Sequence, residues 1–265
     1  ASGDIDVLVA TREAADRLRQ IVCEAQCADN VQSVADFYKK ALPELYAFTA
    51  GEPVDMESTQ TTELLRFAID TAQLPRFAIV DAFLHPLTRT SALNAYDESI
   101  KGTEIYGLDR FGSWAIPFDL VIPGIGRGTL RIAPKAIIVM TPHPQFISLK
   151  KPIQSVADLA AAVERKWGTN CTLVGKAVSL IGMLAAEHIF VFHEGASSYV
   201  KHSRRFHQLL QEAGIPMNPH PILRVKYDTW THWDHCSSWI RLPEPFRQPF
   251  GADELSSSSF AARWK

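Results

Sequence analysis

The sequence predicts a mixed α/β fold, with a mixed α+β arrangement as its close variant, and three observations lead to this class. Helical periodicity dominates residues 1–75. Short apolar runs separated by glycine and proline follow, up to residue 140. From residue 155 onward, strand-like and helix-like segments alternate. Because such alternation is typical of parallel pairing, we expect a helical N-terminal region packed on a mixed sheet, with a parallel βαβα unit near residues 170–214.

The first part of the chain is expected to be helical. Apolar residues recur at helical spacing in three stretches, over residues 12–28, 31–42 and 61–73. Thr11 precedes the first stretch as a favourable N-cap residue. Pro75 ends the third, since the residue before a proline is disfavoured in the α conformation. We therefore assign residues 1–75 to a helical N-terminal region and residues 76–265 to a mixed-sheet α/β domain, the two forming one compact unit.

The central part of the chain is expected to form strands. Apolar runs bounded by turn residues predict four of them, over residues 77–84, 114–122, 129–133 and 135–140. Glycine-rich residues 124–128 lie between the second and third of these strands. Glycine supplies the positive φ that tight turns need, so this segment predicts a hairpin turn. A phosphate-binding glycine motif would need a helix directly after it, whereas residues 129–132 are typical of a strand.

The alternation begins at Ser155, where an N-cap residue with Asp158 three positions later predicts a helix start. We expect two further helices, over residues 175–187 and 197–213, and three strands, over residues 172–174, 188–192 and 222–227. Gly214 closes the last helix at the position where glycine is favoured.

Charge and hydropathy exclude some classes of partner. The 265 residues carry 27 basic and 29 acidic side chains, for a formal net charge of −2. A nucleic-acid binder usually has an excess of cations, because each phosphate that it contacts needs one. No apolar run reaches the ~18 residues that a membrane span requires. We therefore expect neither a nucleic-acid nor a membrane partner.

The four cysteines are too few and too scattered for a disulfide framework. We interpret them as thiols, which places the protein in a reducing, intracellular compartment, the cytoplasm. The chain begins with Ala1 rather than methionine, and its last residues are typical of a helix start. We therefore expect that it is part of a longer polypeptide with additional domains.

The first candidate site combines two strand ends. In open α/β sheets, ligands bind at the carboxyl ends of strands, where helix N-termini offer free N–H groups. Gly175 and Lys176 follow one predicted strand, and residues 193–198 follow the next. We predict a cleft there for a small anionic or phosphate-bearing molecule, with His193 and Glu194 as acid–base groups. The predicted ligand-binding residues are Gly175, Lys176, Gly195, Ser197, Ser198 and Arg204.

The same segment allows other interpretations. Gly195 can be a simple turn residue and Ser197 a helix N-cap, both purely structural. Residues 195–199 also match four of five positions of the nucleophile elbow of α/β-hydrolases, with Tyr199 in place of the last glycine.

The second candidate site is a metal centre. Asp228, His232 and His235 share one face if their segment is helical, because they stand at i, i+4 and i+7. These are suitable ligands for Zn²⁺ or another divalent metal. The structural alternative is that nearby tryptophans anchor the segment on the core while the histidines form hydrogen bonds.

The sequence therefore supports three hypotheses about function. The leading one is a ligand-binding α/β domain, with or without catalysis, at the predicted anion cleft. The second is a non-catalytic interaction or scaffold domain of a larger protein. The third is a metal-dependent hydrolase that uses the metal centre above.

Overall fold

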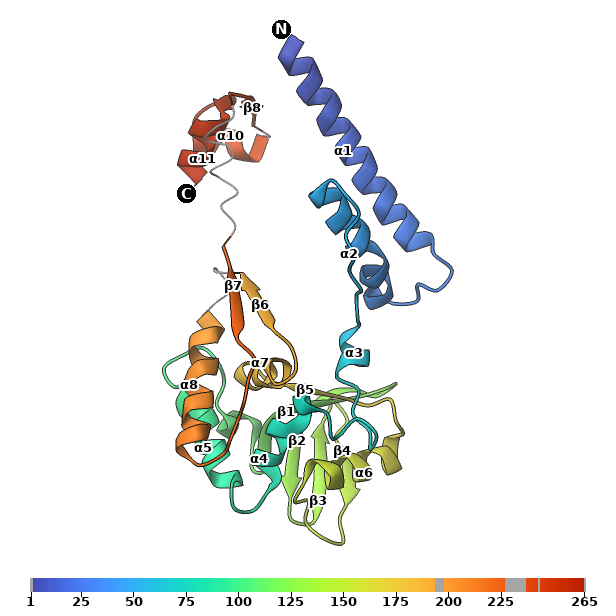
Figure 1. Cartoon of the computed structure of the whole chain (residues 1–265), viewed down its shortest axis with the longest axis vertical. Coiled ribbons are helices and arrows are strands. Elements are labelled where there is room, and N and C mark those ends of the chain that lie inside the picture. The colour runs from blue at the N-terminus through green and yellow to red at the C-terminus, as the bar shows by residue number, and fades with distance from the viewer. Residues whose placement is uncertain (1, 194–197, 227–236, 243, 265) are drawn as a thin grey trace.

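A computed structural model describes residues 2–193, 198–226, 237–242 and 244–264. Its body is an antiparallel five-stranded sheet with helices, and a helical arm extends away from this body (Figure 1). The fold is thus mixed α/β, as the sequence predicts.

The central sheet has the strand order β4-β3-β2-β1-β5, and every pair is antiparallel. Its strands are β1 (Ala115–Ile122), β2 (Gly126–Ala133), β3 (Ala136–Met140), β4 (Gln145–Ser148) and β5 (Thr172–Gly175). The predicted glycine turn joins β1 to β2, and Gly124 and Gly126 have φ angles of 73° and 123°. The strand predictions from residue 114 to 140 are thereby confirmed.

Helices pack against this sheet and share its core. They are η1 (Pro75–Phe77), α4 (Ala78–Leu84), α5 (Arg89–Ile100), η2 (Leu108–Phe111), α6 (Val156–Trp167), α7 (Val178–Ala185) and α8 (Ser198–Glu212). Alternate residues of β2 and β3 are buried, so these strands turn one face to the core and leave the other partly exposed. The side chain of Ser155 caps α6 by accepting a hydrogen bond from the Asp158 N–H, as predicted.

Residues 77–84 are a helix, and the prediction of a strand there was wrong. Five of the seven residues of α4 are buried. A helix that is buried on most of its surface has no polar stripe, so its sequence has the same continuous apolar run as a buried strand. Pro75, at the first position of η1, is the residue that marks the helical start.

The parallel βαβα unit near residues 170–214 is not formed as predicted. β5 pairs antiparallel with β1, while β6 (Phe190–His193) pairs parallel with β7 (Ile222–Val225) in a separate two-stranded sheet. The outer edge of β5 is taken by residues 65–67, since the Phe67 N–H donates to the Cys171 carbonyl and the Leu173 N–H donates to the Leu65 carbonyl. No free edge therefore remains on which β6 can pair with β5.

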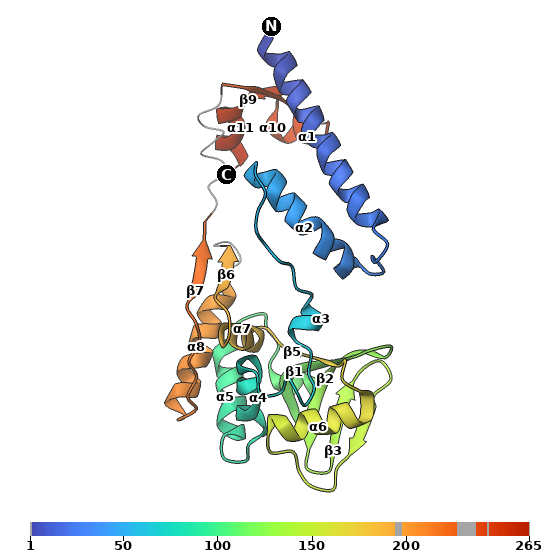
Figure 2. The same cartoon turned by 45° about the vertical axis from the view of Figure 1, so that its right-hand side comes forward.

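The N-terminal region is helical, but its two long helices do not lie on the sheet. α1 (Ser2–Cys27) and α2 (Val34–Ala50) pack against each other and form the arm (Figures 1 and 2). The contact with the sheet is made instead by the segment that follows α3 (Thr61–Leu64), in which Leu65, Phe67 and Ala68 are buried. The predicted helix over residues 61–73 is thus limited to one turn.

The C-terminal elements form a small group beyond β7: β8 (Trp239–Arg241), α10 (Glu244–Phe250), β9 (Glu254–Ser256) and α11 (Ser257–Trp264). β8 and β9 pair antiparallel. Figure 1 places this group on the same side of the body as the arm.

Candidate functional site

The site with the most varied chemistry is a pocket of about 510 Å³ beside β1 and β5. We call it the Asp119 pocket. Its walls come from α5, η2 and the segment between them, from β1, β2 and β5, and from the starts of α7 and α8. The lining residues are Tyr96, Glu104, Ile105, Tyr106, Phe111, Asp119, Arg127, Val174, Gly175, Lys176, Ala177, Leu180 and Tyr199.

The strand register places three charged side chains together in this pocket. Asp119 pairs with Thr129 on one side and with Val174 on the other. Arg127 and Lys176 stand two residues from those partners, and side chains at a spacing of two point to the same face of a sheet. All three therefore project from one face, and Asp119 lies between the two cations.

The contacts of Asp119 follow from this register. Its side chain is only 8% exposed, and the Nε and Nη2 atoms of Arg127 each lie 2.8 Å from its Oδ2. The ammonium of Lys176, whose side chain is 15% exposed, forms an ion pair with the other oxygen, Oδ1. The ammonium also lies 4.3 Å from the centroid of the Phe111 ring, a cation–π distance. A buried carboxylate is thus paired with two cations, and almost none of its surface is exposed to water.

The turn that carries Lys176 is held by hydrogen bonds to β1. The Lys176 N–H donates to the Pro117 carbonyl at 2.8 Å, and the buried hydroxyl of Ser179 lies 2.7 Å from the same carbonyl. Ala177, between them, has a φ of 42°, which is rare for a residue other than glycine. A strained position that the surroundings enforce is common at functional sites. The local structure therefore fixes the direction of the Lys176 side chain.

Gly175 has a structural role in this turn. A Cβ atom at this position would lie 2.4 Å from the backbone nitrogen of Leu180. The start of α7 approaches the strand so closely that only glycine fits without a shift. Gly175 therefore shapes the pocket through close packing.

Aromatic side chains form much of the remaining wall. Tyr96 is fully buried, and its pKa is raised by burial and by the charges of Asp97 and Asp119. Its hydroxyl therefore stays protonated further into the alkaline range than the hydroxyl of an exposed tyrosine. Tyr106 is 53% exposed and carries the Arg110 guanidinium 3.7 Å from its ring centroid. Tyr199, the second residue of α8, is 44% exposed.

The predicted ligand-binding residues do not all meet in this pocket. Gly175 and Lys176 line the Asp119 pocket. Ser198 is the first residue of α8, next to the pocket-lining Tyr199. Arg204 is exposed and follows Tyr199 by five residues, about 140° around the helix, so these two side chains do not share a face. Gly195 and Ser197 lie outside the described residues.

The predicted acid–base and metal groups are only partly described. His193 is the exposed last residue of β6, in the two-stranded sheet rather than beside β5. Glu194 lies outside the described residues, as do Asp228, His232 and His235. Within the described part of the chain, no cluster of three or more histidine, cysteine or acidic side chains has an arrangement that would hold a metal ion.

Sequence reasoning missed Asp119, Arg127 and Tyr96 as site residues. A signal for Asp119 is present, because it is the one charged residue of the buried strand Ala115–Ile122. A buried carboxylate needs a cationic or hydrogen-bonding partner, so its presence in an apolar strand points to a nearby cation. Tyr96 has no comparable signal, since a tyrosine in an amphipathic helix is ordinary core.

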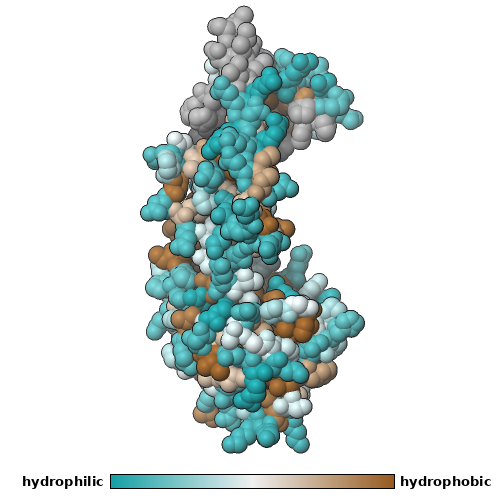
Figure 3. Space-filling model, turned by 90° about the vertical axis from the view of Figure 1, so that its right-hand side faces the viewer, coloured by the Kyte–Doolittle hydropathy of each residue, from teal (hydrophilic) through white to brown (hydrophobic). Residues whose placement is uncertain are grey.

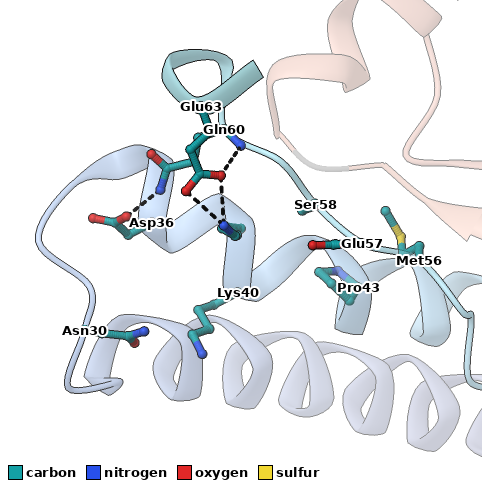
Figure 4. Close-up of a pocket in the computed structure, with 10 residues that line it drawn as sticks. Asn30, Asp36, Lys40, Pro43, Met56, Glu57, Ser58, Gln60 and Glu63 are labelled. Carbon is teal, nitrogen blue, oxygen red and sulfur yellow. Dashed lines mark hydrogen bonds and ion pairs between the residues drawn. The ribbon is translucent and has the colours of Figure 1, made fainter. Parts of the chain in front are cut away.

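A second pocket, of about 460 Å³, lies between α2 and the segment that leads to α3 (Figure 4). Its charged groups mostly bind one another. Lys39 forms an ion pair with Glu63 at 3.0 Å, and the Gln60 amide donates to Asp36 at 2.5 Å. Hydrogen bonds to Asp36, first of all from the Ser33 hydroxyl and then from the Gln60 amide, lower the pKa of its carboxyl group. These contacts join the arm to α3 and to its N-cap residue, which favours a structural role for this pocket.

None of the helices in the described ranges is both long and apolar enough to cross a bilayer. Comparison of the chain with protein-family models, with curated proteins and with solved structures found no match.

Proposed function

We propose that the protein is a ligand-binding α/β domain and that the Asp119 pocket binds a small anionic or phosphate-bearing molecule. The observation that carries the proposal is the pairing of one buried carboxylate with two cations at the pocket wall. Asp119 neutralises one of the two charges, which leaves an excess positive charge among these three groups. The exposed carboxylate of Glu104 lies at the rim, where solvent screens its charge.

Arg127 is the group expected to receive the anion. Its side chain is 56% exposed, so the ligand can reach it without moving the backbone. The Nε and Nη2 atoms contact Asp119, while Nη1 makes no hydrogen bond to any residue that the structure describes. A guanidinium binds carboxylate and phosphate through charge-assisted hydrogen bonds, which are about twice as strong as neutral ones. Lys176 is more deeply buried, and its positive charge would add to the electrostatic attraction between the pocket and the anion.

The shape of the pocket favours a ligand with a flat apolar part. The rings of Phe111, Tyr106 and Tyr199 line it, and about 510 Å³ lies within the ~300–1,000 Å³ range of small-molecule sites. Aromatic rings bind flat molecules by stacking or edge contacts. A ring that carries one carboxylate or phosphate group therefore matches both parts of the pocket.

A buried ion pair adds little net stability, because desolvation offsets much of the attraction. The cluster around Asp119 is therefore poorly explained as a stabilising device. This supports a role in binding.

The test is a calorimetric titration of the protein with aromatic carboxylates and with nucleoside monophosphates. We expect saturable 1:1 binding that Arg127→Gln weakens by about tenfold, the loss of one charge-assisted hydrogen bond of ~1.5 kcal/mol. Lys135→Gln, an exposed change in the turn between β2 and β3, is the matched control and should leave the affinity unchanged. Equal effects of the two changes, or no saturable binding by either class of compound, would contradict the proposal.

The other hypotheses stay predictions. Acid–base catalysis by His193 and Glu194 would require both groups to reach the bound ligand. An interaction domain is expected to expose a large apolar patch. On the face in Figure 3, by contrast, hydrophobic residues form separate small groups among hydrophilic ones. The metal-dependent hydrolase would retain stoichiometric metal after gentle purification, and His232→Ala with His235→Ala would abolish it.

We further propose a reducing, cytoplasmic location. Cys23, Cys27 and Cys171 are free thiols, two of them exposed, which is typical of proteins from reducing compartments. Disulfide mapping of the protein isolated from its native cells tests this point.

A further inference from the structure

A third pocket, of about 600 Å³, lies at the opposite edge of the central sheet from the Asp119 pocket. One wall is the chain from the end of β4 to residue 153, and the other is one face of α6. We call it the basic groove. Its lining residues are Ile147, Ser148, Leu149, Lys150, Lys151, Pro152, Ile153, Asp158, Ala161, Ala162, Arg165 and Lys166.

Four cations converge on this groove. Lys150 and Lys151 come from the segment after β4, and Arg165 and Lys166 come from the last turn of α6. All four are exposed, and none forms an ion pair or a hydrogen bond through its side chain with any residue described in the structure. The positive charge of the groove is therefore available to a ligand.

The acidic groups near the groove are already engaged. Asp158 is the one carboxylate among its lining residues, and it accepts a hydrogen bond from the Gln154 N–H at the start of α6. Glu164, on the same helix, accepts a hydrogen bond from the Ile69 N–H at 2.8 Å and does not line the groove. Four cations against one carboxylate leave an excess of three positive charges.

Helix stabilisation accounts for only half of this cluster. Cations in the last turn of a helix interact favourably with the helix dipole, which explains Arg165 and Lys166. Lys150 and Lys151 belong to a different element, so the dipole of α6 does not account for them. The groove also has an apolar floor, formed by the buried Ile153 and by Ala161 and Ala162 of α6.

We infer that the basic groove is a second binding site, for a small molecule that carries two or more phosphate groups. Several cations on facing walls match several phosphates better than a single carboxylate, because each phosphate oxygen can accept charge-assisted hydrogen bonds. A concave pocket of this volume fits a small molecule, and its apolar floor can take the part of the ligand that bears the phosphates. This inference is independent of the proposed function, since the two pockets share no residue.

The experiment is a calorimetric titration of the whole chain with inorganic pyrophosphate at low and at raised salt. We expect saturable binding that weakens with salt, because the groups involved are exposed. The double change Lys151→Gln and Arg165→Gln removes one cation from each wall and should weaken binding at least tenfold. The matched double change Lys101→Gln and Lys201→Gln removes two exposed charges elsewhere and should change the affinity less than twofold.

Two further measurements distinguish the basic groove from the Asp119 pocket and a free phosphate compound from a lipid headgroup. Arg127→Gln should leave pyrophosphate binding to the basic groove intact, so failure of one pocket is distinguishable from failure of the other. Vesicles of anionic lipid test whether the phosphates belong to a membrane. Binding of vesicles without binding of pyrophosphate would overturn the inference, as would equal losses in the two double variants or an absence of saturable binding.

Discussion

Two hydrogen bonds of 2.7 Å join the guanidinium of Arg76 to the carboxylate of Glu187, 111 residues further along the chain. The side chains are 11% and 22% exposed. Arg76 lies in η1, before α4, and Glu187 follows α7, which carries the turn of Lys176 at its start. The pair therefore connects the helical layer to the element that builds the Asp119 pocket.

Glu187→Gln is expected to destabilise the protein by about 2–4 kcal/mol, because it leaves a partly buried cation without its counter-charge. Glu98→Gln, in an exposed pair with Lys101, is the control and should cost less than ~1 kcal/mol. Chemical denaturation at neutral pH measures both. Equal effects would show that the buried pair contributes no more to the free energy of unfolding than the exposed pair does.

The same pair predicts a dependence on acid. Burial acts to raise the pKa of Glu187, but the hydrogen bonds and charge of Arg76 outweigh it, so the pKa is below 4.5. The unfolded chain then takes up the proton at a higher pH than the folded chain. The stabilisation is complete above pH 4.5 and is lost as the pH falls through the folded value. In Glu187→Gln, this part of the acid sensitivity should disappear.

His207 predicts a second pH effect, at higher pH. It is 9% exposed, its Nδ1 lies 2.8 Å from the Ser203 carbonyl, and its Nε2 has no partner among the described residues. Burial lowers its pKa below 6.5, and the hydrogen bond to Ser203 offsets this only in part.

The unfolded chain therefore binds this proton first as the pH falls, and stability should decrease as the pH falls through about 6.5 towards the lower pKa of the folded protein. His207→Leu should flatten that decrease. His143→Leu, an exposed change, should leave the slope unaltered. The unfolding free energy of each variant, followed over this range, measures the effect.

The turn at residues 175–177 predicts opposite effects of two small substitutions. Gly175→Ala would place a Cβ 2.4 Å from the Leu180 nitrogen and should destabilise the protein by about 2–3 kcal/mol or more. Ala177→Gly relieves a φ of 42° and should be neutral or stabilising by up to ~1 kcal/mol. Thermal and chemical unfolding give both values. A neutral Gly175→Ala would mean that α7 moves away easily.

Cys171 is expected to be unreactive in the folded protein. It is fully buried, and burial raises its pKa to about 11, so little thiolate is present at neutral pH. Cys23 and Cys27 are exposed and should react with a maleimide at once. Peptide mapping after brief labelling, with and without denaturant, distinguishes the sites. Labelling of Cys171 as rapid as that of Cys23 would indicate that the core around β5 opens readily.

Local patterns predicted those elements whose partners are close in the chain. The hairpin of β1 and β2 follows from its glycine turn, and α6 follows from the Ser155 cap. The position of Lys176 between a strand and a helix also agrees with the prediction, because both elements follow from local pattern. Asp119 was not connected to it, since their pairing depends on a strand register between segments more than fifty residues apart.

By itself, the sequence determined the mixed α/β class, most strands of the central sheet and the position of Lys176, because turn chemistry, capping and hydrophobic periodicity act over a few residues. Only the tertiary structure decided that residues 65–67 occupy the edge of β5, that residues 77–84 are a helix, and that Asp119 lies between Arg127 and Lys176. Each of these outcomes depends on which of several distant segments occupies a given hydrogen-bonding edge or a given buried volume. Local sequence patterns do not predict that choice, because they extend over only a few residues.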